Sequence, residues 1–201
     1  TNVTLAGVAA TIVSGSDTEV VVIAAAGPDN VTGDVVMHSD TGAHTTVTDG
    51  FTYLVASTIV DVSPAFGQHK TRVVIIGTSL LASGLSVTNV TLADIPAEVE
   101  FFNDTHVIVS AGRFRGGRLG SVIVTSSTGA TTTSEDAWTY RPEGNITSVS
   151  PSSGQRGTYV TLSGAQLSGY SSSVVSVVIG DVGAAIQAQS NETIVVRIGQ
   201  K

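Results

Sequence analysis

The stretch "IVDVSPAFG" at residues 59–67 decides the fold, because a close copy, "ITSVSPSSG", returns at residues 146–154. A shift of 87 positions relates the two copies. The same shift places "TNVTLA" at residues 1–6 on an identical stretch at residues 88–93. It also places "FTY" at residues 51–53 on "WTY" at residues 138–140. A repeat of constant period is the mark of structural modules arranged in tandem.

The repeat predicts three modules, of which only the central one is complete. Residues 1–57 correspond to the C-terminal part of a module, residues 58–143 to a whole module, and residues 144–201 to the N-terminal part of a third. One inserted residue near Ser190 aligns Asn103 with Asn191. We interpret the chain as a window from a longer tandem array. The alternative is that strands of a neighbouring chain complete the two end modules.

Composition predicts an all-β protein. Val and Thr are abundant, and β-branched residues pack well on a pleated sheet but lose rotamer freedom in a helix. Seven strands are expected in the central module, at residues 59–62, 72–76, 87–92, 97–101, 106–110, 121–125 and 137–141. Trp138 and Tyr140 lie two apart and therefore share one face, which we predict to be the core. By the same alternation, Val3, Leu5, Val90 and Leu92 should face the core, and Asn2 and Asn89 should face solvent.

The module openings resemble the start of an IPT/TIG domain, the immunoglobulin-like module of plexins and some transcription factors. The matching positions are Ile59, Val62, Pro64, Gly67, Val73, Ile75, Gly77 and Leu80, and in the next copy Ile146, Val149, Pro151, Gly154, Val160, Leu162, Gly164 and Leu167. The resemblance implies tandem immunoglobulin-like β-sandwiches. It also implies one of two settings, nuclear DNA-binding factors or extracellular stacks.

Every asparagine in the chain begins an Asn-x-Thr sequence without proline, which is the acceptor pattern for N-glycosylation. We therefore predict covalent N-glycans, passage through a eukaryotic secretory pathway, and a place outside the cell or at its surface. For Asn103 and Asn191, turn formation is an alternative reason for the asparagine. The six predicted sites are Asn2, Asn30, Asn89, Asn103, Asn145 and Asn191.

Charge and residue types exclude several other classes of protein. The net charge of −7 disfavours nucleic acid as a partner, which requires clustered Lys and Arg. No apolar run approaches the roughly 20 residues that span a bilayer. There is no cysteine, and none of the four histidines recurs in a neighbouring copy. The sequence therefore predicts no catalytic residue, no metal site and no cofactor.

One loop, "GRFRGGR" at residues 112–118, is unusual for its three arginines around a phenylalanine. We predict a contact site for an acidic partner or a glycan, with Phe114 stacking and Arg113, Arg115 and Arg118 binding carboxylates. A solvated hairpin loop is the alternative interpretation.

These features together favour a non-enzymatic extracellular structural or adhesion protein, whose modules form a rod or fibre in a cell coat, flagellar hair or similar filament. The expected partners are further copies of the module in the same chain and other chains in the filament or coat. Two alternatives remain: a receptor ectodomain that binds a protein ligand, as in plexins, or spacer modules of a secreted glycan-active enzyme.

Overall fold

A computed structural model describes residues 2–199, so Thr1 of the first "TNVTLA" and the last two residues of the third module lie outside the described part. The described residues form nineteen β-strands. The chain divides into two compact units between Ser57 and Thr58. No helix in the described residues is long and apolar enough to cross a membrane.

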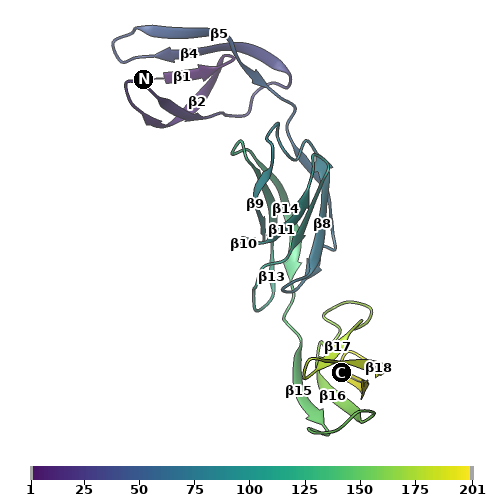
Figure 1. Ribbon diagram of the computed structural model, residues 1–201. Helices are drawn as coiled ribbons and strands as arrows, with labels where there is room; N and C mark the ends of the chain where they lie inside the picture. The colour runs from purple at the N-terminus through teal and green to yellow at the C-terminus, as the bar shows by residue number, and fades with distance from the viewer. Residues whose placement is uncertain (1, 200–201) are drawn as a thin grey trace. The chain divides into compact units, whose positions relative to one another are not determined.

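The central module is a sandwich of two sheets, as the sequence predicted. One sheet has the order β10-β9-β13-β14-β7 and the other β11-β12-β8-β6. Figure 1 shows β9 and β13 on one side of this module and β8 on the other. The strands are β6 (Thr58–Ser63), β7 (Phe66–Gly67), β8 (Arg72–Thr78), β9 (Val87–Leu92), β10 (Ile95–Pro96), β11 (Glu98–Phe102), β12 (His106–Ser110), β13 (Arg118–Ser126) and β14 (Thr131–Tyr140).

The core of the central module lies between these sheets and contains the residues expected from the two-residue alternation. Trp138 and Tyr140 on β14 are fully buried, and their rings meet edge to face with centroids 5.5 Å apart. Val90 and Leu92 on β9 are fully buried, whereas Asn89, which directly precedes Val90, is exposed. The predicted core and solvent faces of this strand are therefore confirmed.

Several predicted strand limits in this module were wrong by one to three residues, and the start of the last strand was wrong by six. β14 begins at Thr131 rather than at residue 137. Its early part carries no apolar signal, because the buried position there is taken by Thr132. The short strands β7 and β10 were also missed. Each has only two residues, and β7 exists because it pairs in parallel with the end of β14.

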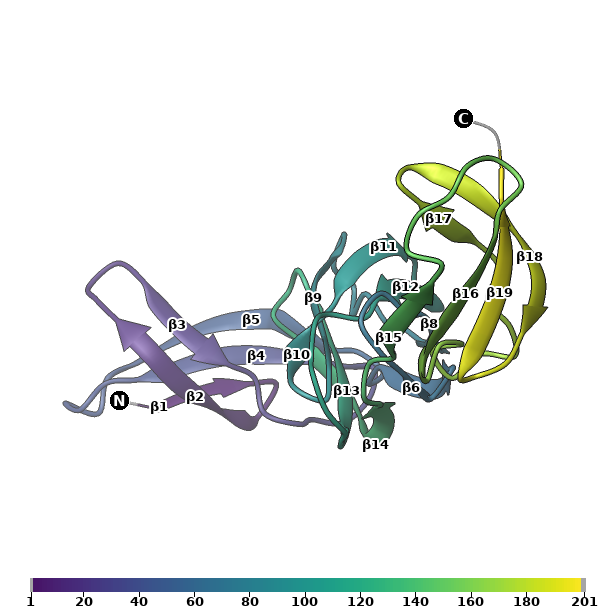
Figure 2. The same ribbon diagram turned by 90° about the horizontal axis from the view of Figure 1, so that it is seen from below.

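The unit at Thr1–Ser57 contains one five-stranded sheet of order β3-β2-β1-β4-β5. Val3 and Leu5 are buried and Asn2 is exposed, as predicted, and Tyr53 is also buried. Figure 2 shows β2 and β3 as a hairpin beside the longer β4–β5 ribbon. The strands are β1 (Asn2–Leu5), β2 (Val8–Gly15), β3 (Val20–Ile23), β4 (Val31–His38) and β5 (His44–Tyr53).

The last module also contains one sheet, of order β15-β16-β19-β18-β17. Its small core is built on Val160, Leu162, Ile194 and Val196, and Figure 2 shows their strands β16 and β19 side by side. The strands are β15 (Asn145–Ser150), β16 (Tyr159–Ala165), β17 (Val177–Ile179), β18 (Val182–Gln189) and β19 (Thr193–Ile198).

The "TNVTLA" strand leads in each module into the same two-residue hairpin turn. Both turn residues have positive φ, which is the backbone of a type I′ turn and matches the twist of the flanking strands. The turn residues are Ala6 and Gly7, Ala93 and Asp94, and Gly180 and Asp181. The third turn appears at the position that the 87-residue shift predicts, although its strand has lost the "TNVTLA" letters.

The insertion expected near Ser190 is absent, and this correction changes the alignment of Asn191. Val107 pairs with Ile75 and Ile194 pairs with Leu162, so the shift of 87 continues without a gap. Ser190 therefore stands where Asn103 stands in the central module. Asn191 corresponds to Asp104, and the match between the two asparagines was a coincidence of letters.

Because Tyr140 is buried, the stability of the central module is expected to fall as the pH rises through the alkaline range. The loss of hydration raises the pKa of Tyr140 to about 12, and the Gly112 backbone offsets this only in part. The hydroxyl has no hydrogen-bond partner of normal geometry among the described residues. The folded module therefore favours the neutral phenol more strongly than the unfolded chain does.

We expect the central module to keep full stability below pH 10 and to lose about 2 to 3 kcal/mol as the pH rises to 12. The unfolded tyrosine deprotonates first, with an ordinary pKa near 10. Guanidinium unfolding of the chain at pH 8, 10, 11 and 12 measures the loss. Tyr140→Phe should flatten this dependence, since it removes the titrating group and leaves the ring in place. An equally steep decline in the Phe variant would contradict the assignment.

Candidate functional site

All six sequon asparagines lie on the surface of their modules. Each is exposed, and the hydroxyl-bearing threonine two residues later is exposed or half-buried. Asn2 and Asn89 take the same position on β1 and β9, and Asn145 is the first residue of β15. Asn30 has positive φ in the turn before β4. The geometry leaves these four asparagines open to solvent.

Asn103 performs a turn function that serine performs in the other two modules. Its Oδ1 accepts hydrogen bonds from the backbone N–H groups of Thr105 at 2.9 Å and His106 at 2.7 Å. The hydroxyl oxygens of Ser16 and Ser190 accept equivalent bonds at the matching turns. Asn103 is therefore a turn residue, as the alternative interpretation held, and it acts through its side-chain oxygen Oδ1. Glycan attachment would use the other side-chain atom, the nitrogen Nδ2.

Asn191 is tied into its module by both ends of its amide. Its Nδ2 donates to Gln166 Oε1 at 2.9 Å, and its Oδ1 accepts from Ser168 Oγ at 2.9 Å. The equivalent Asp104 accepts from the backbone N–H of Leu81 at 3.2 Å. A glycan on Asn191 would replace one of the two hydrogens on Nδ2, the atom that donates to Gln166, so attachment there is expected to disturb this contact.

The loop at residues 112–118 uses most of its unusual side chains within the module. Phe114 is half-buried and packs on Tyr140, with ring centroids 5.3 Å apart. Arg118 forms an ion pair with Asp94 and lies over the Phe114 ring, and Arg115 is 4.0 Å from Glu143. Phe114 is therefore a core-edge residue rather than a free stacking platform. The partner contact predicted for Arg113, Phe114, Arg115 and Arg118 stays a prediction.

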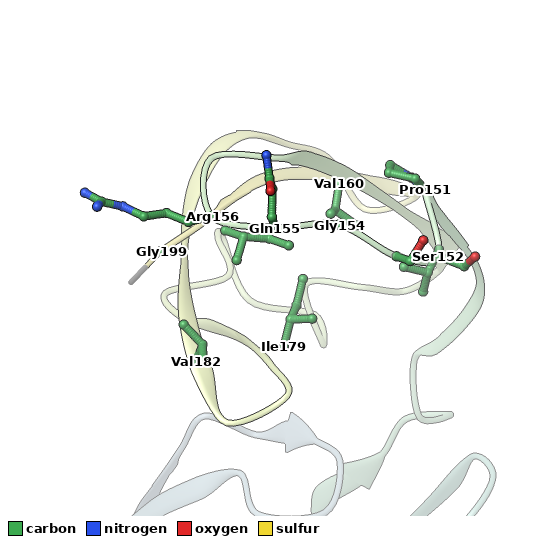
Figure 3. A pocket seen from close by; sticks show the side chains of 12 residues that line it. Pro151, Ser152, Gly154, Gln155, Arg156, Val160, Ile179, Val182 and Gly199 are labelled. Atoms are coloured by element: carbon green, nitrogen blue, oxygen red, sulfur yellow. The ribbon is translucent and has the colours of Figure 1, made fainter. Parts of the chain in front are cut away.

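A pocket of about 450 Å³ opens in the last module and has no predicted site residue in its wall. Figure 3 shows residues 151–156 along one side, Ile179 and Val182 across from them, and the Arg156 side chain extending away. The wall is mainly apolar, with Val149, Val160 and Ile198 among its residues. Among the lining residues, Gln155 and Arg156 have the long polar side chains.

The tandem repeat explains this pocket. In the central module, β7 pairs with the end of β14, and the N–H of Arg141 donates to the carbonyl of Gly67 at 2.7 Å. Trp138 and Tyr140 belong there to the same core cluster as Val73 and Leu92, whose counterparts Val160 and Ile179 line the pocket. The pocket therefore lies beside positions whose counterparts belong to the aromatic core of the central module. We assign no small-molecule ligand to it.

Sequence reasoning missed one cluster, the pair His38 and His44. Their rings lie across neighbouring strands with centroids 5.9 Å apart. The two histidines are six positions apart in the sequence, which matches no helical metal-ligand spacing, and the β4–β5 hairpin brings them together. Among the described residues, no group of three or more His, Cys, Asp or Glu side chains is placed to hold a metal ion.

Two packed sheets, an aromatic strand in the core and the tandem repeat define the class of the protein as all-β with immunoglobulin-like sandwiches. The family model for the IPT/TIG domain matches residues 57–140 and 145–201, and the chain belongs to this family. No curated protein matches the chain significantly.

Two solved structures are similar to this chain at low sequence identity. The full extracellular region of plexin A4 matches with a TM-score of 0.51 and 17% identity over 98% of this chain. The surface glycan-binding protein SGBP-B of Bacteroides ovatus, solved with a mixed-linkage heptasaccharide, matches with a TM-score of 0.35 and 12% identity over 100% of this chain. The chain spans 18% of the plexin ectodomain and 50% of SGBP-B.

Proposed function

We propose that the chain is part of a non-enzymatic, N-glycosylated extracellular protein in which tandem IPT/TIG modules serve a structural or adhesive role. The observation that carries this proposal is that all six asparagines begin sequons and all six are exposed. Unselected asparagines would fall at many positions that are not followed by threonine two residues later. A glycan coat would cover the polar, weakly charged surfaces and shield exposed strand edges.

The tandem organisation supports a mechanical role. Each module carries its own core cluster, so the array gains length by adding modules without enlarging a single core. The surface is poor in charged residues, which make up 12% of the chain, and glycans would supply the solubility that charge usually gives. We propose that further modules of the same chain, and other chains in a filament or coat, are its partners.

The second candidate is a receptor ectodomain, and the exposed Arg113 favours it as part of a contact surface for an acidic partner. Two observations place it below the structural role. Arg115 and Arg118 already have acidic partners within the module, and the Phe114 ring is packed on Tyr140. Spacer modules of a glycan-active enzyme remain the third candidate; no catalytic family is indicated for any part of the chain.

We expect intact mass of the protein from its native source to fall when N-glycans are removed enzymatically. The enzyme converts each occupied asparagine to aspartate, so peptide mapping identifies the sites. Asn2, Asn30, Asn89 and Asn145 should be occupied most fully, since their side chains stand open to solvent. Asn191 should be occupied least, because its Nδ2 donates to Gln166. A native protein with no glycan at any of the six positions would contradict the secretory part of the proposal.

A further inference from the structure

His38 and His44 stand directly opposite each other at the end of the β4–β5 hairpin. The backbone N–H of Ser39 donates to the carbonyl of Ala43 at 2.8 Å, just beyond the pair. In an antiparallel ladder this bond pattern marks a non-hydrogen-bonded pair, in which the two Cα atoms approach to about 4.5 Å and the side chains lie closest. Both histidines are exposed, and they lie on the face opposite Met37, which is half-buried and packs against the core.

The distance between the rings suits a shared metal ion. A tetrahedral Zn²⁺ holds imidazole nitrogens at about 2.0–2.1 Å, which places two bound rings with centroids roughly 5 to 6 Å apart. The observed separation is 5.9 Å with a tilt of 42°. Side-chain rotation therefore suffices to aim both rings at one ion, and the backbone of the hairpin can stay in place.

We propose that His38 and His44 form a two-histidine site for a divalent transition-metal ion of borderline softness, the class that includes Zn²⁺, Ni²⁺ and Cu²⁺. Water completes the coordination, because the described residues offer no third carboxylate, imidazole or thiol in a suitable place. Asn2 is the cross-strand neighbour of His38 on β1 and lies on the same face. A bound ion would link the two strands next to the connecting turn.

The central module provides a natural comparison at the equivalent hairpin. Thr125 and Thr131 form the same pair there, and the N–H of Ser126 donates to the carbonyl of Ala130 at 2.9 Å. The backbone geometry recurs, but threonine side chains offer a weak ligand set for such metals. The proposed site is therefore a property of the first module and not of the central one.

The test is titration of the unglycosylated 201-residue chain with Zn²⁺, followed by calorimetry and by the histidine ring signals in NMR spectra. We expect one ion per chain, with the signals of His38 and His44 shifting together. His38→Ala and His44→Ala should each weaken binding at least about tenfold, because a single ligand loses the benefit of the second on the same scaffold. His69→Ala and His106→Ala are the matched controls and should leave affinity unchanged.

A gain-of-site variant separates the proposal from general surface binding. Thr125→His combined with Thr131→His should raise the stoichiometry from one ion to two, since the second hairpin has the same pairing. Unchanged hairpin amide signals in the His38 and His44 variants establish that loss of binding does not reflect loss of fold. The proposal is overturned if Zn²⁺ does not bind, if the His38 and His44 signals stay still, or if removing both histidines leaves affinity unchanged.

Discussion

Replacing Trp138 with alanine is expected to destabilise the central module by about 3–5 kcal/mol, the usual effect of deleting a fully buried aromatic side chain. Trp138 has no exposed surface and packs edge to face on Tyr140. The same core cluster includes Val73, Val90 and Val109. These residues lie in paired strands, so we expect the backbone to close only part of the cavity that the indole ring would leave. A single module has a total stability of about 5–15 kcal/mol, so the variant should leave it marginal.

Phe51 supplies a matched control, because it is the counterpart of Trp138 in the first unit and is only half-buried. Phe51→Ala should cost about 1–2 kcal/mol, in proportion to the smaller apolar area that it removes from water. Urea unfolding followed through the amide signals of each unit measures both effects in one chain. Equal losses from the two variants would show that the aromatic strand does not organise the central core as described.

Gly77→Ala is expected to destabilise the same module by about 3 kcal/mol through overpacking. A Cβ atom at Gly77 would lie 2.1 Å from the carbonyl oxygen of Thr58 and 2.7 Å from Leu80 Cδ2. The first neighbour is backbone of β6, which pairs with β8 on both sides of this point. The strands would have to separate to admit one methyl group, and Gly164→Ala should act likewise against Asn145 in the last module.

Gly117→Ala tests whether the effect depends on this close approach. Its Cβ would meet only the carbonyl oxygen of Tyr140 at 3.9 Å, an ordinary contact. We expect a change within about 0.5 kcal/mol for this loop position. Thermal unfolding of both variants, with hydrogen exchange of the β6 and β8 amides, measures the difference. If the β6 and β8 amides of Gly77→Ala stay as protected as in the parent chain, the close approach of these strands does not require glycine at position 77.

The main strands, the faces they bury and the module type could be predicted from the amino-acid sequence. Alternating burial is visible one residue at a time, so Val90 and Leu92 could be placed in the core and Asn89 on the surface without coordinates. The 87-residue repeat identified corresponding positions, and the type I′ turns at residues 6–7, 93–94 and 180–181 follow it. Solvent exposure of Asn2 and Asn89 followed from the same alternation, and the turn positions of Asn103 and Asn191 from turn chemistry.

Features that depend on pairing between strands could be established from the folded chain alone. The pairing of β16 with β19 fixes the register around Ser190 and shows that the expected insertion is absent. The sequence was misleading here because serine and asparagine can both supply the side-chain acceptor of this turn. The packing of Phe114 on Tyr140 could not be predicted for a different reason: loop residues carry no periodic signal of burial. His38 and His44 meet because an antiparallel hairpin sets residues side by side according to the length of its turn, and sequence spacing alone does not reveal which pairs meet.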